Sequence, residues 1–136
     1  MTATMREYAL TKTVSLMDDV VFALHAAAKL PDEEAVHKMR VSIRRFQQAL
    51  RLFRQYFEEK GIEKIKAELR SVMDVAGELR NRDIAMALVT EAGVDPQALF
   101  NQRMQFKHKL TEVLRPYAKP DLSLRWRGLL GLESAA

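Results

Sequence analysis

Apolar residues recur at intervals of three and four along most of this 136-residue chain, and this spacing constrains its fold more than any other feature. Such a spacing places apolar side chains on one face of an α-helix. Glycine and proline, which interrupt helices, number only 5 and 4. Long stretches rich in Ala, Leu, Met, Glu, Lys, Arg and Gln also favour helix. We therefore predict an all-α protein.

Breaks in this pattern predict four helices with short connections. The helices are expected at about residues 3–29, 32–59, 63–91 and 95–115. Pro31 stops the first, because proline disfavours helical geometry in the residue before it, and Asp32 caps the second. Gly61 is expected to end the second helix and Gly93 the third. Short connections make consecutive helices pack antiparallel, which predicts an up-down four-helix bundle.

Two positions in the second half of the chain carry further expectations. Asp95 is expected to cap the fourth helix with Pro96 at its first position, and that helix ends before Pro116 or near Pro120. Gly77 lies inside the third helix, where it either permits a close helix approach or is a local weak point.

The segment after residue 120 is too apolar for a disordered end. Its large apolar residues are Leu122, Leu124, Trp126, Leu129, Leu130 and Leu132. The segment is either a fifth short helix folded onto the bundle or a contact surface for a partner. The length suits a single domain, so we expect one four-helix domain over residues 1–136, with its core at about 3–118 and an apolar tail at 121–132.

Composition excludes several classes of protein. There is no Cys, which excludes disulfides and thiolate chemistry. The N-terminal residues lack the layout of a signal peptide, and no apolar run is long enough to span a bilayer. We expect a cytoplasmic protein. The net charge of +4 is only mildly basic, so the distribution of charge says more about partners than its sum.

The stretch from Ala35 to Phe57 carries six cations and no acidic residue. On a helix with about 100° per residue, its apolar side chains form one stripe. That stripe contains Met39, Ile43, Phe46, Leu50, Phe53 and Phe57. The opposite side carries His37, Arg40, Arg44, Gln48, Arg51 and Gln55, and Lys38 and Arg45 flank it. The second helix is therefore predicted to present a basic face opposite its core face.

This basic face favours binding of a polyanion. Like charges three or four residues apart repel, and no acid at that spacing relieves the repulsion here. Arginine clamps phosphate oxygens in bidentate fashion, while His37 and Gln48 add donors. Carboxylates of neighbouring helices could instead neutralise the face, and a nucleic acid is also allowed. Because the aromatic residues lie on the core stripe, a base-stacking platform is not indicated, which favours a plain phosphate chain.

The segment from Val36 to Phe53, VHKMRVSIRRFQQALRLF, resembles the signature helix of the CHAD family, the conserved histidine α-helical domain. That signature has a His, an Arg three residues later and then paired arginines, which fall on His37, Arg40, Arg44 and Arg45. A second segment, Glu68 to Leu88, is also similar to the family. Its matching positions are Gly77, Leu79, Arg80, Asp83 and Ile84, and Asn81 departs from the Asp that the family often has.

The resemblance implies an all-helical fold that binds inorganic polyphosphate in a basic channel, without catalysis. A family domain is usually about twice this length, with two related four-helix bundles that each offer a basic helix, so this chain resembles one half of it. Two copies related by a two-fold axis could rebuild the channel. We accordingly expect a homodimer, with the apolar tail as its adhesive surface.

The third helix carries two further candidates for the site. Arg80 and Asp83 are three residues apart and could form a partly buried ion pair that braces the bundle. Alternatively, Arg80 or Arg82 reaches the anion and Asp83 orients a basic side chain of the second helix. The polyphosphate-binding residues predicted here are His37, Lys38, Arg40, Arg44, Arg45, Gln48, Arg51, Arg80 and Arg82.

Metal, cofactor and catalytic sites are not expected. His25, His37 and His108 lie on three different helices, whereas a metal site needs several ligands that converge. A phosphatase that uses His37 would need an acidic metal cluster or a partner base, and neither can be identified. Two alternatives to polyphosphate binding stay open. One is a helical module that binds nucleic acid, and the other is a scaffold subunit with an incidental basic face.

Overall fold

Helices are the only regular secondary structure in residues 4–132, the part of the chain that the computed structural model describes. The predicted all-α class is therefore confirmed. The helices are α1 (Met5–Lys29), α2 (Glu33–Leu52), α3 (Glu59–Glu91), α4 (Gln97–Leu114) and α5 (Leu122–Leu129), with the 3₁₀ turns η1 (Arg54–Tyr56) and η2 (Arg115–Tyr117). The predicted helix start at Ala3 and the domain end at residues 133–136 lie outside the described residues.

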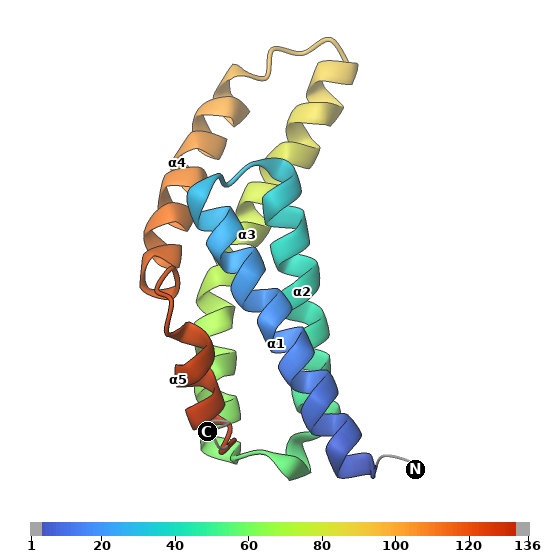
Figure 1. Ribbon diagram of the computed structural model, residues 1–136. Helices are drawn as coiled ribbons and strands as arrows, with labels where there is room; N and C mark the ends of the chain where they lie inside the picture. Colours follow the sequence, from blue (N-terminus) through green and yellow to red (C-terminus); the bar gives the residue numbers. More distant parts are fainter. Residues whose placement is uncertain (1–3, 133–136) are drawn as a thin grey trace.

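The helices form two antiparallel pairs, α1 with α2 and α3 with α4 (Figure 1). At 33 residues, α3 is the longest element. Its second half lies beside α4, and its first half lies beside α5, which follows α4 down the same side of the molecule. The position next to α3 is therefore shared by two shorter helices.

The predicted cap at Asp32 is confirmed, but α4 begins at Gln97 with Pro96 as its N-cap, so the prediction that Asp95 caps this helix with Pro96 at its first position is wrong by one residue. The Asp32 carboxylate accepts a hydrogen bond from the Ala35 amide at 2.8 Å, and the Asp95 carboxylate accepts one from the Gln97 amide at 3.0 Å. These bonds satisfy amides that have no partner within the helix. Gly93 ends α3 with a φ of 76°, which glycine adopts without strain.

The predicted boundary between the second and third helices is wrong. α2 ends at Leu52, the chain tightens into η1, and α3 already begins at Glu59. The reason is burial of Phe57, which is extended between the two elements and belongs to the core. A continuous helix to residue 59 would not allow the chain to turn at this side chain.

Gly61 does not end a helix, contrary to prediction, but lies inside α3 where α5 comes close. A Cβ at Gly61 would lie 1.6 Å from the Leu129 carbonyl oxygen, so only glycine fits. At Gly77 a Cβ would meet nothing within 4 Å. Of the two explanations offered for Gly77, close helix approach is therefore wrong.

The apolar tail packs onto its own chain. Leu122, Trp126 and Leu130 are buried in the main core, which extends past the predicted limit at residue 118. The Trp126 ring stacks on Phe46 of α2 with 5.9 Å between ring centroids, and its Nε1 donates to Glu68 at 2.9 Å. The alternative of a fifth short helix folded onto the bundle is therefore confirmed, with Leu124 left 63% exposed, while the expected homodimer stays a prediction.

Candidate anion-binding site

Three arginines gather where α2 and α3 face each other. Arg40 and Arg44 come from α2, one helical turn apart, and Arg80 comes from α3. Burial lowers the pKa of the Arg40 guanidinium, and the positive charges of Arg44 and Arg80 lower it further. The three residues, which we call the arginine cluster, therefore form a region of concentrated positive charge.

The arginine cluster is poorly neutralised by the protein itself. Arg80 pairs with Glu33 at 3.6 Å, but the Glu33 side chain is 66% exposed, so the pair is weak. Arg40 Nε is buried and has no hydrogen-bond partner within residues 4–132. A buried donor without a partner is costly. An anion placed here would satisfy that donor and relieve the repulsion between the guanidiniums.

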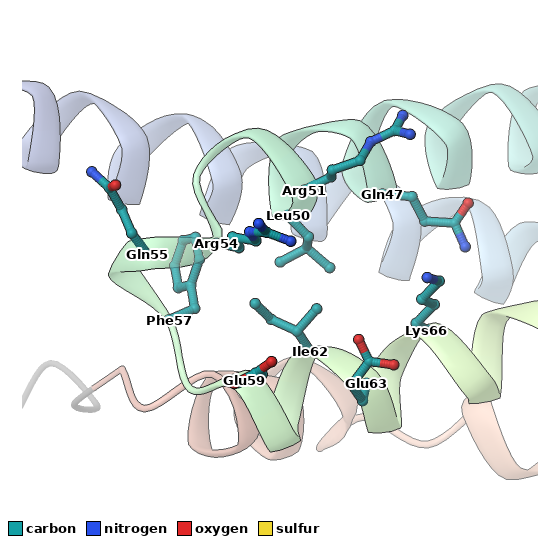
Figure 2. Close-up of a pocket in the computed structure, with 10 residues that line it drawn as sticks. All are labelled: Gln47, Leu50, Arg51, Arg54, Gln55, Phe57, Glu59, Ile62, Glu63 and Lys66. Atoms are coloured by element: carbon teal, nitrogen blue, oxygen red, sulfur yellow. The ribbon is translucent and has the colours of Figure 1, made fainter.

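A cleft of about 720 Å³ lies further along the same two helices. Arg51 and Arg54 line it from the end of α2 and η1, and Lys66 lines it from α3 (Figure 2). Arg40, Arg44, Gln47 and Arg51 follow one another at steps of four and three along one stripe of α2, and Arg54 comes three residues later in η1. The basic seam, as we call the arginine cluster together with Gln47, Arg51, Arg54 and Lys66, therefore follows the α2–α3 boundary.

The basic seam contains residues that sequence reasoning missed, namely Gln47, Arg54 and Lys66. Arg54 could have been found by extending the steps of four and three beyond Arg51. Lys66 lies on another helix, and only the packing brings it to the cleft. Glu59 and Glu63 also line the cleft, so its charge is mixed at that end.

Four of the predicted residues lie elsewhere on α2. His37, Lys38 and Arg45 are exposed and line a shallower groove between α1 and α2. Lys38 pairs with Glu34 at 3.1 Å, an acid just outside the acid-free stretch. Gln48 is exposed and lines neither the cleft nor the groove. The predicted face is therefore divided between two sides of the helix.

Arg82 points to α4 and away from the basic seam. Its guanidinium pairs with Glu78, donates to the Gln102 side chain at 3.3 Å and lies 4.5 Å from the centre of the Phe106 ring. These contacts satisfy the side chain without a ligand, so the structure gives Arg82 a role in joining α3 to α4.

The predicted ion pair between Arg80 and Asp83 does not form. Asp83 pairs instead with Arg103 of α4, and these side chains are only 9% and 16% exposed. Arg80 pairs with Glu33 of α2. Residues three apart on α3 therefore face different neighbours, because Arg80 lies on the α2 side of the helix and Asp83 on the α4 side. A partly buried ion pair does join α3 to α4, but Asp83 forms it with Arg103 and not with Arg80.

Residues 4–132 contain no group of three or more His, Asp or Glu side chains that could hold a metal ion. Over the same residues, no helix combines the length and the apolar character needed to cross a membrane.

Comparison with known families places the chain in one of them. The sequence model of the CHAD domain matches residues 19–136, nearly the whole chain. The chain therefore belongs to the CHAD domain family, as the two sequence motifs indicated. Neither the curated proteins nor the solved structures gave a match.

Proposed function

We propose that this protein binds inorganic polyphosphate along the basic seam and carries out no chemistry on it. The main observation behind the proposal is that Arg40, Arg44 and Arg80 lie close together, and within residues 4–132 their one ion pair is that of Arg80 with the exposed Glu33. Membership of the CHAD domain family supports it, because polyphosphate binding is the function expected of that family.

The shape of the basic seam favours an extended ligand over a single phosphate. From Arg40 to Arg51 the stripe spans about 16 Å of helix. A linear polyanion that follows this stripe would contact cations from both α2 and α3.

The fold underlying the seam is proposed to be an up-down bundle with four helical positions, the fourth shared by α4 and α5.

The experiment is a titration of long-chain polyphosphate into wild type and the double variant Arg40→Gln/Arg44→Gln. Each charge-assisted contact contributes about 1.5 kcal/mol or more. Its loss should therefore weaken binding about tenfold per arginine, or about a hundredfold in all.

The matched control is Arg115→Gln/Lys119→Gln, which removes two exposed cations four residues apart near the end of α4. Both double variants change the net charge equally, so a general charge effect would weaken both to the same extent. Equal losses would contradict the proposed site, and so would normal binding by a folded Arg40→Gln/Arg44→Gln protein.

A second candidate ligand is single-stranded nucleic acid, and Phe22 favours it. The Phe22 ring is 77% exposed on α1 and lines the groove that also contains His37, Lys38 and Arg45. An exposed ring beside cations can stack a base. Competition with RNA and DNA at equal phosphate concentration separates the two ligands. Preference for nucleic acid, lost in Phe22→Ala, would favour this candidate over polyphosphate.

A further inference from the structure

The far end of the α3–α4 pair has no core of its own. Residues 80–109, which we call the hairpin, include no buried residue. The pair extends beyond the connection between α1 and α2, so no other helix within residues 4–132 covers this end (Figure 1). Helices of this length are marginal in water unless an apolar face is packed. The hairpin therefore lacks the packing that the rest of the molecule has.

The hairpin also exposes large apolar side chains. Ile84 and Leu88 of α3 and Phe100 and Met104 of α4 are between 45% and 61% exposed, and we call these four the apolar face. Ile84 and Leu88 follow Arg80 at steps of four, so they continue the stripe of α3 that faces α2. On α4, steps of three and four lead from Met104 to the buried Leu114.

This spacing shows what kind of surface the apolar face is. Lower in the molecule, the same stripes of α3 and α4 pack against α2 and α1. Beyond the α1–α2 connection they continue without a covering layer. The apolar face is therefore one open half of a four-helix arrangement, and another pair of helices would complete it.

The charges of the hairpin indicate which pair of helices fits. From Ile84 to Gln102 there is no Lys or Arg, and the only charged residues are Glu91 and Asp95 near the tip. The base of the hairpin carries Lys107 and Lys109, and neither forms an ion pair within residues 4–132. The hairpin is thus acidic at its tip and basic at its base.

We propose that the apolar face binds the apolar face of a second copy of this chain, with the two hairpins antiparallel. A two-fold axis across the hairpins places each acidic tip against the basic base of the other copy. A parallel arrangement would bring four carboxylates together and is disfavoured. The proposal does not depend on the ligand of the basic seam.

The size of the face sets the strength expected. With the residues that flank the apolar face, positions 84–91 of α3 and 97–104 of α4 each extend about 12 Å along the helix. Together they offer a contact area on the order of 500 Å² per copy, near the lower limit of a specific interface. The dimer should therefore dissociate in the micromolar range, and its test must cover concentrations on both sides of that value.

The test is analytical ultracentrifugation of the full chain from about 1 to 500 µM, a range set around the affinity expected of an interface this small. Leu88→Glu should raise the dissociation constant at least about tenfold, because it places a charged carboxylate within the buried apolar contact. The matched control is Leu52→Glu, since Leu52 is 73% exposed and lies outside the hairpin. This control should leave the association unchanged.

A second variant, Met104→Glu, makes the same change on α4, and circular dichroism checks that each variant is folded. Glu91→Lys should also weaken the dimer, because it removes the charge complementarity between tip and base. Wild type that stays monomeric throughout this range would overturn the proposal. A dimer that tolerates both Leu88→Glu and Met104→Glu would overturn it as well, because its interface would lie elsewhere.

Discussion

The two sides of α3 differ in how completely they are packed and neutralised. On the side facing α4 and α5, Gly61 lets a carbonyl approach closely, and Asp83 and Glu68 pair with arginines. On the side facing α2, Gly77 has open space beside it, and Arg80 of the arginine cluster pairs with the exposed carboxylate of Glu33. Cations on the closed side hold helices together, whereas those on the open side are available to a ligand.

Gly61→Ala should have the largest effect on stability. The new methyl group would meet the Leu129 backbone at 1.6 Å, and a backbone cannot rotate away as a side chain can. Separation of α3 and α5 should cost about 3 kcal/mol or more. Urea unfolding measures the loss. A variant as stable as wild type would show that α5 is not held against α3.

Asp83→Ala should have the second largest effect and lower the free energy of unfolding by about 3 kcal/mol. The reason is that it leaves Arg103 partly buried without its carboxylate partner. The matched variant Asp83→Leu/Arg103→Met removes both charges and should recover most of the loss. Chemical denaturation of the two proteins provides the comparison. Equal destabilisation by the single and double changes would contradict the pairing described for this side of α3.

Gly77→Ala should stabilise the protein by about 0.5–1 kcal/mol. Alanine loses less conformational freedom than glycine when a helix forms, and the added methyl group meets nothing within 4 Å. A rise in the unfolding midpoint, opposite in sign to the change at Gly61, would confirm that the α2-facing side is open. A fall at both positions would contradict the comparison.

Tyr117→Phe should have the smallest effect, confined to alkaline pH. Burial and the Glu68 charge raise the pKa of Tyr117 above its usual 10.0, partly offset by Arg125. The folded state thus holds this proton more tightly than the unfolded state. The resulting stability is fully present below about pH 10 and is lost as pH rises through the raised pKa. Wild type should lose stability more steeply above pH 10 than the variant, and parallel profiles would contradict this assignment.

The sequence predicted the helical class, the cap at Asp32 and the charge of α2. These depend on local spacing, which a helix converts directly into position. It did not predict the partner of Asp83 or the contribution of Lys66, because contacts between helices depend on how far each is rotated about its axis. Gly61 was misread for a related reason, since close packing against α5 and a helix end both favour glycine.

The same limit affected the basic face. Helical periodicity grouped His37 with Arg40, but these residues lie on different sides of α2 once α1 and α3 are in place. Periodicity identifies one face opposite the core. Neighbouring helices divide that face into a groove and a seam, and only the seam contains the arginine cluster.

The most direct measurement of the central claim is the NMR signal of the arginine Nε–H groups during a polyphosphate titration. Arg82 Nε already donates to Gln102 and Arg103 Nε to Asp83, whereas Arg40 Nε has no partner within residues 4–132. The Arg40 signal should shift on binding, while those of Arg82 and Arg103 stay in place. A titration that shifts Arg82 or Arg103 and leaves Arg40 unchanged, or that shifts none of the three, would contradict the account.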